Sequence, residues 1–340
     1  MKNIKNSKKP SFFKKLFVKL SRKLGYEIID QNNFKIVTSD KKINDNLSIL
    51  GKKSINMPLG EVKVTRKVKT LDIIIRTCAS VNMLTQNKAR LFEKEKIEYT
   101  VRTIKSLLNS ANDPELKNLK INFVVIDHNS TNENLKAIES LFKKFGKNHS
   151  LINLDVSKFS QNIEKLNQRG EEVTDNQKSN MANIHQSLLE AKKCNDLVYF
   201  VEDDYIHKKE SLKEMVFTYE RISSQLEKEI IICPADYPYL YAKSEITQNF
   251  LGQNYHWRKV NETLCTFLTS KKIIEKYWGK YLSMCEKEHA PFEKPMHDIY
   301  EKELCISPIP SLALHFTNIN SIFGLSPNVD WEKVWKENEK

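Results

Sequence analysis

Three consecutive acidic residues, Glu202, Asp203 and Asp204, follow the apolar run LVYFV. Such a run is typical of a buried strand, and side chains at the carboxyl end of a strand lie where open α/β sheets bind their ligands. Carboxylates that lose water without gaining a partner repel one another strongly. Mg²⁺ or Mn²⁺ would offset this repulsion, because both ions prefer hard oxygen ligands. The alternative is that the acids cap a helix near Lys208 or stay solvated in a turn.

The elements around this triplet alternate between apolar, β-branched runs and charged helical stretches. This alternation predicts an α/β fold with a mixed, mostly parallel central sheet flanked by helices. Strands are expected at 71–77, 121–127, 151–156, 196–204, 229–235 and 263–270. Helices are expected near 89–109, 132–145, 179–193, 208–224, 270–283 and 296–303.

The chain of 340 residues, 40% of them hydrophobic, can bury one substantial core. We therefore expect a single catalytic domain over residues 69–320. Residues 1–25 are expected to form a basic amphipathic helix, 26–68 a linker or small irregular subdomain, and 321–340 a tail or lid.

The first 25 residues hold nine of the Lys and Arg residues and no acid, in a chain of net charge +12. Within them, Phe13, Leu16, Phe17, Leu20 and Leu24 recur at helical spacing. This pattern is typical of an in-plane anchor on an anionic membrane surface, and a helix that docks on the catalytic domain is the alternative. Because the charge gathers at one end, we expect no nucleic-acid partner.

The six cysteines include no C-x-x-C pair, which argues against a cysteine zinc site and favours reduced thiols in the cytoplasm. No apolar stretch reaches the roughly 20 residues of a membrane span. The sequence also lacks a glycine-rich phosphate-binding motif. Any bound phosphate would therefore need a different partner, and a cation on the acidic triplet is the leading candidate.

The ordered set LDIIIRT, VVIDHNST, KSNMANIHQSLLEAK and DLVYFVEDD, followed by a later acidic helix, resembles glycosyltransferase family 2 and its relatives with the GT-A fold. The resemblance spans roughly residues 70–320. It implies transfer of a sugar from a nucleoside diphosphate sugar, with UDP-sugars favoured, to the hydroxyl of a glycan or lipid-linked acceptor. It also implies a divalent metal and inversion at the anomeric carbon. Surface-polysaccharide or glycolipid assembly at the inner face of the membrane is expected from the basic helix instead.

The resemblance also implies roles for single residues. Arg76 and Thr77 match positions that line the nucleoside pocket, and Asp127 matches an acid that contacts the base, although Asp127 could instead belong to a plain turn and helix cap. Asp298 matches the general base, with His297 as an alternate base. The expected metal ligands are Asp204, Glu202 and His315.

Further binding residues are expected beside these. Asn180 and Asn183 share one face of the helix after Lys178, so all three are candidates for donor contacts, and a solvated helix face explains the spacing equally well. Asp203 is expected on ribose or sugar hydroxyls. Trp257 is the candidate for stacking on the acceptor sugar, with core packing as its alternative.

Two other functions fit parts of the sequence. One is nucleotidyl transfer on a similar sheet, although such enzymes usually carry a glycine-rich loop after the first strand, and IIIRTCASVNM lacks one. The other is a non-catalytic, membrane-associated carbohydrate-binding protein with a purely structural acidic turn.

Overall fold

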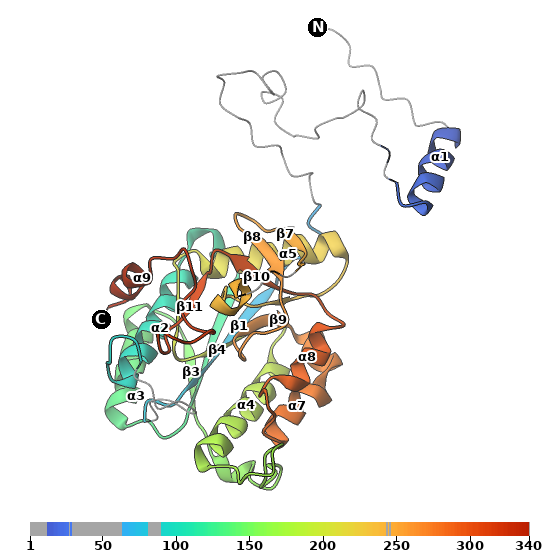
Figure 1. Cartoon of the computed structure of the whole chain (residues 1–340). Coiled ribbons are helices and arrows are strands. Elements are labelled where there is room, and N and C mark those ends of the chain that lie inside the picture. Colours follow the sequence, from blue (N-terminus) through green and yellow to red (C-terminus); the bar gives the residue numbers. More distant parts are fainter. Residues whose placement is uncertain are drawn as a thin grey trace. The chain divides into compact units, whose positions relative to one another are not determined.

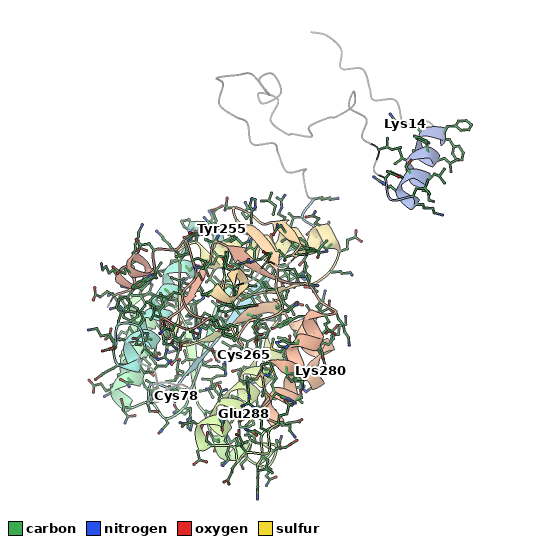
Figure 2. All side chains as sticks on the ribbon, in the orientation of Figure 1. Lys14, Cys78, Tyr255, Cys265, Lys280 and Glu288 are labelled. Carbon is green, nitrogen blue, oxygen red and sulfur yellow. The ribbon has the colours of Figure 1, made fainter. Side chains whose placement is uncertain are left out.

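The computed structural model describes residues 12–26, 28, 63–80, 90–242, 244 and 246–339. The chain divides into two compact units, Met1–Val62 and Lys63–Lys340. The first unit contributes one described helix, and the second holds the sheet and the remaining helices (Figures 1 and 2). No helix in the described part of the chain is both long and apolar enough to cross a bilayer.

Apart from α1 (Phe12–Lys23), which belongs to the first unit, all the described helices and strands lie in the second unit. The helices are α1 Phe12–Lys23, α2 Lys96–Ala111, α3 Asn132–Lys144, α4 Asp175–Lys193, α5 Ser211–Leu226, α6 Lys271–Lys276, α7 Trp278–Glu286, α8 Lys294–Tyr300 and α9 Trp331–Glu337. The strands are β1 Thr70–Thr77, β2 Lys120–Asp127, β3 His149–Asn153, β4 Leu197–Glu202, β5 Tyr205–His207, β6 Ile231–Ile232, β7 Asn249–Leu251, β8 His256–Lys259, β9 Phe267–Ser270, β10 Cys305–Ile309 and β11 Ala313–His315.

The central sheet, as far as the described residues show it, has nine strands in the order β3-β2-β1-β4-β9-β6-β10-β8-β7. Only β8 and β9 run against the other seven strands of that sheet. The inner strands are buried on both faces, and β1 is buried from Leu71 to Thr77. This burial explains their unbroken apolar runs. The predicted α/β fold with a mixed, mostly parallel sheet is confirmed.

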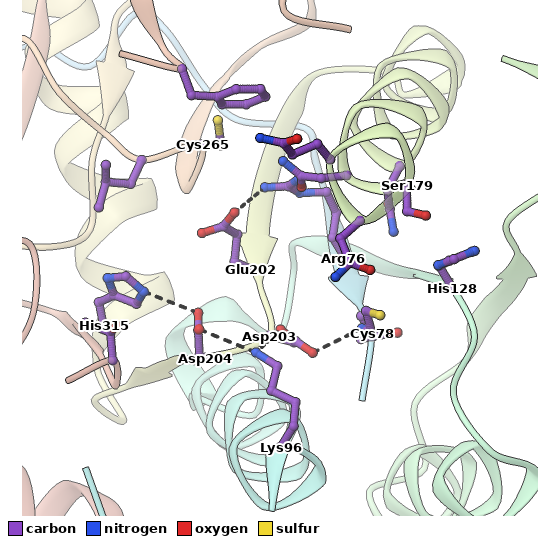
Figure 3. Close-up of a pocket in the computed structure, with 18 of the residues that line it drawn as sticks. Arg76, Cys78, Lys96, His128, Ser179, Glu202, Asp203, Asp204, Cys265 and His315 are labelled. Atoms are coloured by element: carbon purple, nitrogen blue, oxygen red, sulfur yellow. Dashed lines mark hydrogen bonds and ion pairs between the residues drawn. The ribbon is translucent and has the colours of Figure 1, made fainter. Parts of the chain in front are cut away.

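The strand order reverses between β1 and β4. From β1 the chain steps to β2 and β3 on one side, and then returns to place β4 on the other side. Successive right-handed crossovers therefore put α2 and α3 on one face of the sheet and α4 on the opposite face (Figure 1). At such a reversal the loops part and leave a crevice outside the carboxyl ends of the strands. Arg76 and Glu202 are direct neighbours across this boundary (Figure 3).

The C-terminal helix α9 packs on α2. Trp335 is buried, and the guanidinium of Arg102 lies 4.1 Å from the centre of its ring. Arg102 also donates a hydrogen bond to the carbonyl of Trp335 at 2.7 Å. Residues 331–337 thus belong to the packed body. In the rest of the predicted tail or lid, Phe323 lines the cavity described below.

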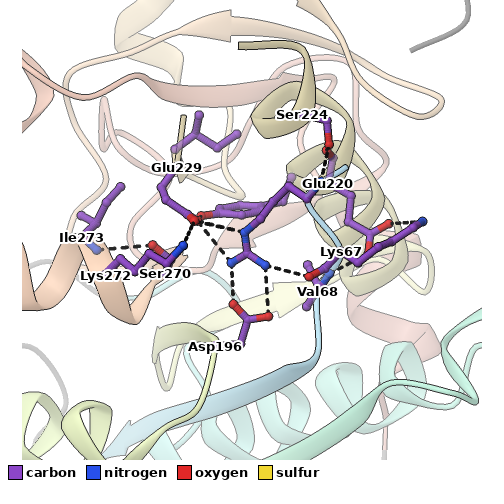
Figure 4. A network of polar contacts seen from close by, with 12 residues as sticks. Lys67, Val68, Asp196, Glu220, Ser224, Glu229, Ser270, Lys272 and Ile273 are labelled. Atoms are coloured by element: carbon purple, nitrogen blue, oxygen red, sulfur yellow. Dashed lines mark hydrogen bonds and ion pairs between the residues drawn. The ribbon is translucent and has the colours of Figure 1, made fainter. Parts of the chain in front are cut away.

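Arg66 fixes the segment that enters β1, at the amino ends of the strands, through ion pairs with two acids that Figure 4 labels, Asp196 and Glu229. Its guanidinium pairs with Asp196 at 2.5 Å, just before β4, and with Glu229 at 3.1 Å. The backbone N–H groups of Thr65 and Arg66 donate to the hydroxyl of Ser224 on α5. These contacts tie three elements together at the end of the sheet that lies opposite the carboxyl ends of β1 and β4.

Replacing Arg66 by alanine is expected to lower the free energy of unfolding by about 2 kcal/mol, because two partly buried carboxylates lose their shared cation. Urea unfolding measures the change. The matched control is Lys67→Ala, since Lys67 pairs with Glu220 but is 67% exposed. We expect a loss below about 0.5 kcal/mol for that pair. Equal losses in the two variants would contradict the assignment.

Candidate active site

A cavity of about 460 Å³ opens at the carboxyl ends of β1 and β4 (Figure 3). Its walls come from the strand ends, from the first half of α4, from the loops before β9 and α8, and from the segment after β11. Among its lining residues are Arg76, Thr77, Arg90, Lys96, Asn180, Asn183, Glu202, Asp203, Asp204, Glu262, Glu293, His315 and Phe323. The cavity therefore occupies the crevice that the reversal of strand order predicts.

The acidic triplet sits between two strands of different sheets. Glu202 ends β4, and the chain then turns through Asp203 and Asp204 into β5. Because β5 pairs antiparallel with β11, Tyr205 lies opposite His315. The two rings stack with their centres 4.6 Å apart. This pairing brings a residue more than 100 positions away in sequence beside the triplet, and it places the imidazole Nε2 3.6 Å from Asp204 Oδ1.

Each acid of the triplet forms an ion pair with at least one basic side chain. The sequence prediction assigned their charge compensation to a metal ion, whereas the structure supplies part of it from the chain itself. The pairs are Arg76–Glu202 at 2.6 Å, Lys96–Asp203 at 2.6 Å, Arg90–Asp204 at 2.7 Å and Lys96–Asp204 at 3.4 Å. The buried cations thus hold the acids in fixed positions.

The pKa values of Asp204 and Glu202 are shifted in opposite directions. Burial raises the pKa of Asp204, but the charges of Lys96, His315 and Arg90 outweigh burial and hold it well below the usual value. Burial also raises the pKa of Glu202, and the charge of Arg76 offsets this only in part. Asp204 is therefore the firmly ionised member and the stronger candidate for a cation ligand.

Glu202, Asp204 and His315 fit a divalent cation. Each offers one ligand atom, and these three atoms lie within 4.8 Å of one another. Asp204 Oδ1 is buried and has no hydrogen-bond partner among the described residues. His315 Nδ1 lies 2.8 Å from the carbonyl of Phe323, which fixes the ring. With Nδ1 donating there, a metal ion can take the place of the proton on Nε2. The two carboxylates suit Mn²⁺ or Mg²⁺, and the imidazole is a ligand that softer divalent ions such as Zn²⁺ also accept.

The charge of the cavity also favours an added cation. Among the described residues that line it, three are obligate cations, Arg76, Arg90 and Lys96, while six are carboxylic acids. The acids are Glu202, Asp203, Asp204, Glu262, Glu288 and Glu293. A diphosphate would meet net repulsion in this cavity, and a divalent ion would remove most of it.

The predicted donor residues on α4 separate into two groups. Asn180 accepts a hydrogen bond from Arg76 at 3.0 Å and lines the cavity. Asn183 also lines it and donates to the carbonyl of Ile126 at 3.2 Å, while its Oδ1 is buried and unpaired in the described structure. Lys178 is instead half-exposed, pairs with Asp175 on its own helix and does not line the cavity. Its expected donor contact therefore receives no support from its position.

Thr77 and Asp127 lie at the ends of adjacent strands, but only Thr77 lines the cavity. The carboxylate of Asp127 is buried and accepts hydrogen bonds from Thr77 Oγ1 at 2.7 Å and from the N–H and hydroxyl of Ser130. These bonds match the turn that was the alternative interpretation. His128 and Asn129, directly after Asp127, line the cavity in its place.

Asp203, expected on ribose or sugar hydroxyls, lines the cavity at its floor. Besides pairing with Lys96, it accepts hydrogen bonds from Thr100 Oγ1 at 2.9 Å and from the N–H of Cys78 at 3.2 Å. The second contact joins the acidic turn to the loop that follows β1. Asp203 therefore couples the two sides of the crevice.

The structure corrects the positions expected for Trp257 and Asp298. Trp257 is fully buried in β8, with its Nε1 directed at Glu214 on α5, so it packs in the core and cannot stack on an acceptor. A Cβ on Gly252 would collide with that Nε1, which shows how closely the backbone approaches the ring. Asp298 is half-exposed on α8, pairs with Lys280 and does not line the cavity. It is therefore not placed to act as the general base.

A second acidic group occupies the wall where the base was expected. Glu262, Glu293 and His297 bring ligand atoms within 4.8 Å of one another, and both glutamates line the cavity. Glu293 is buried and accepts hydrogen bonds from the N–H groups of Thr263 and Cys265 and from the Thr263 hydroxyl. His297 Nε2 lies 3.1 Å from Glu262. His297, the predicted alternate base, therefore contacts Glu262 and does not itself line the cavity.

The two glutamates differ in protonation. Burial, and then the hydrogen bond and the charge of Glu293, raise the pKa of Glu262 to about 9. Burial also raises the pKa of Glu293, but hydrogen bonds from Glu262, Thr263 and Cys265 outweigh it and hold the pKa below the usual value. Near pH 7 the pair therefore holds one proton on Glu262, and Glu293 is ionised.

Sequence reasoning missed Arg90, Lys96, Glu262 and Glu293. Arg90 and Lys96 fell inside a stretch interpreted as a single charged helix, whereas α2 begins only at Lys96. Glu262 precedes two consecutive residues in the left-handed region, Leu264 and Cys265. Such backbone strain is often found at functional sites, but leucine and cysteine are not residue types from which a left-handed conformation can be predicted. Glu293 precedes Lys294-Pro295 at the start of α8, a helix-start signal that marks its position but not its partner.

No protein-family model and no curated protein matches the chain. Solved structures do match it. An active-site mutant of LgtC matches at 14% identity and a TM-score of 0.35, over 63% of this chain and 64% of that one. Mouse xyloside xylosyltransferase 1 matches at 11% identity and a TM-score of 0.36, over 68% and 76%. A UDP-glucose pyrophosphorylase complexed with UDP-glucose matches at 8% identity and a TM-score of 0.36, over 79% and 98%.

The chain thus spans 64% of the length of LgtC. Two of these matches are glycosyltransferases by name and the third is a pyrophosphorylase, and the chain is similar to each of them.

Proposed function

We propose that the protein is a metal-dependent glycosyltransferase that moves a sugar from a nucleoside diphosphate sugar to an acceptor hydroxyl. The observation that carries the proposal is the convergence of Glu202, Asp204 and His315 in the cavity at the reversal of strand order. Ligands of open α/β sheets bind at this position. The cavity volume of about 460 Å³ falls within the usual range for small-molecule sites.

Glu202, Asp204 and His315 would hold a single Mn²⁺ or Mg²⁺. When bound, the ion supplies positive charge to the diphosphate leaving group. Arg76 keeps Glu202 in place through its 2.6 Å ion pair, and Arg90 and Lys96 keep the other oxygen of Asp204 occupied. Of the two oxygens of Asp204, Oδ1 has no hydrogen-bond partner among the described residues and is left to face a cation. Thr77, Asn180, Asn183 and Asp203 are the proposed contacts of the donor.

Glu293 takes the role that the sequence assigned to Asp298. Its carboxylate is ionised near neutral pH and lines the cavity, so it can accept the proton of an acceptor hydroxyl. Glu262, which carries the proton of the pair, orients Glu293 and can donate a hydrogen bond to the substrate. Removal of the hydroxyl proton makes the acceptor oxygen the nucleophile, while the diphosphate leaves with the electrons of the broken bond.

The finer parts of the proposal follow from the sequence resemblance. They are a UDP-sugar donor, a glycan or lipid-linked acceptor and inversion at the anomeric carbon. The role in surface polysaccharide or glycolipid synthesis is inferred from the basic helix at the amino end. A cytoplasmic location fits the six cysteines, all free, five of them buried.

The test is thermal unfolding with UDP-, GDP- and CMP-sugars, each with Mn²⁺, with Mg²⁺ or with EDTA. We expect one nucleoside diphosphate sugar to raise the unfolding temperature only when metal is present. A ligand at 100 times its dissociation constant stabilises by about 2.7 kcal/mol, which corresponds to roughly 5 °C or more for a domain of this size. The matched control is the nucleoside monophosphate, because it lacks the diphosphate.

Two outcomes would count against the proposal. Equal stabilisation in EDTA would remove the metal from the mechanism, and no response to any nucleotide would favour a non-catalytic protein. Slow metal-dependent hydrolysis of the stabilising donor would support transfer chemistry. Release of pyrophosphate from a nucleoside triphosphate and a sugar phosphate would instead favour nucleotidyl transfer.

A further inference from the structure

Helix α1 exposes an almost complete apolar face. None of its residues is buried. The exposed fractions are 74% for Phe12, 80% for Phe13, 55% for Leu16, 61% for Phe17 and 58% for Leu20. Scattered single apolar residues on a surface are ordinary, but five within three turns of one helix indicate a surface that another phase or partner covers.

The polar face of α1 carries one sign of charge. The charged residues of α1 are Lys14, Lys15, Lys19, Arg22 and Lys23, all of them basic, and the first 25 residues contain no acid (Figure 2 labels Lys14). An acidic protein surface could pair with such a helix, but it would leave the aromatic face without a matching apolar partner. An anionic bilayer offers both parts, since its headgroups are negative and its acyl chains are apolar.

We propose that α1 lies in the plane of an anionic membrane surface, with Phe13, Leu16, Phe17 and Leu20 inserted among the acyl chains and the basic residues at the headgroups. The helix has 12 residues and so measures about 18 Å, which is too short to span the roughly 30 Å hydrocarbon core. It therefore binds along the surface, as amphipathic helices do.

This placement deepens the proposed function and rests on it in one respect. An enzyme held at a bilayer by its own helix meets acceptors that are confined to that bilayer. The proposed acceptor class is therefore a lipid-linked hydroxyl compound and not a free glycan. The docking itself does not depend on the enzyme activity.

The first experiment is co-sedimentation of the full chain with vesicles of phosphatidylcholine, with or without phosphatidylglycerol, in the absence of nucleotide. We expect the affinity for anionic vesicles to exceed that for neutral vesicles by about 10-fold or more, and to fall as salt screens the charges. The helical circular dichroism signal should rise on binding, because an isolated helix of this length is marginal in water.

Two double variants test whether vesicle binding depends on α1 and not on the rest of the chain. Phe13→Glu with Phe17→Glu should abolish vesicle binding. Lys15→Glu with Lys19→Glu should remove the preference for anionic lipid. The matched control is Lys117→Glu with Lys165→Glu, which changes the net charge equally at exposed lysines of the second unit and should bind like the wild type. Thermal unfolding of each variant shows that the second unit remains folded.

Each result has a distinct meaning. Equal binding to neutral and anionic vesicles, or unchanged binding in the Phe13 and Phe17 variant, would overturn the docking. A dimer that forms through α1 without vesicle binding, as measured by sedimentation velocity, would also overturn it. If vesicles bind but no nucleotide sugar does, the proposed function fails and the docking stands. If transfer to a soluble acceptor equals transfer to a lipid-linked one, only the acceptor class falls.

Discussion

Replacing Asp204 by asparagine is expected to reduce metal-dependent binding of the nucleoside diphosphate, and transfer with it, by at least about 100-fold. The asparagine keeps the shape of the side chain but removes the charge that faces Glu202 and His315. Asp204 Oδ1 is buried without a hydrogen-bond partner among the described residues, so the loss of its negative charge acts on the bound cation. Titration calorimetry with Mn²⁺ and the stabilising nucleotide measures the effect.

The same substitution also weakens the pairs with Arg90 and Lys96, so a loss of about 1–3 kcal/mol in stability is expected beside the functional loss. Asp196→Asn is the matched control, because Asp196 is equally buried and pairs with Arg66 at the opposite end of the sheet. It should lower stability by a similar amount and leave nucleotide binding intact. Normal metal-dependent binding by Asp204→Asn would remove the triplet from the site.

Replacing Glu293 by glutamine is expected to lower the rate of transfer by about 10²–10⁴-fold, while donor binding stays within a few-fold of the wild type. Glu262→Gln should retain most activity, because the pKa of about 9 means that Glu262 already carries a proton at pH 7 and glutamine imitates that form. Initial rates with the identified donor, set beside donor affinities, separate the two effects.

The pH dependence adds a second readout. In the wild type the rate should fall as the pH rises through about 9, because ionised Glu262 places a second charge beside Glu293 and no longer donates to it. The fall should be absent in Glu262→Gln. Asp298→Asn makes the same chemical change outside the cavity and should keep full activity. If Glu293→Gln were active or Asp298→Asn inactive, the assignment of Glu293 as the general base would be wrong and Asp298 on α8 would be the candidate again.

The strands could be predicted because their signal is local. The unbroken apolar runs in β1, β2 and β4 follow from burial on both faces, and their expected bounds lie close to the observed ones. The short strand β5 was not expected, since a three-residue strand carries no periodicity. The stretch at 270–283 proved to be two helices, α6 and α7, which meet at Tyr277.

Site residues could be predicted only where a side chain of suitable chemical type directly follows a recognisable buried strand. Glu202 and Asp204 follow a buried strand, and the resemblance pointed to His315, but the pairing of β5 with β11 that joins them is not visible in the sequence. Trp257 and Asp298 have suitable chemistry, yet their strand and helix turn them away from the cavity. Glu262 and Glu293 acquire their properties from each other, across a sequence separation of 31 residues that no local pattern reveals.

The ion pairs of Arg66 determine how the second unit would respond to a pull from its amino-terminal side. A force transmitted along the backbone reaches Arg66 before it reaches β1. The contacts of Arg66 with Asp196, Glu229 and Ser224 distribute this force over the start of β4 and over α5. Because these contacts lie at the opposite end of the strands from the acidic triplet, a force borne by them would leave the geometry of the cavity undisturbed.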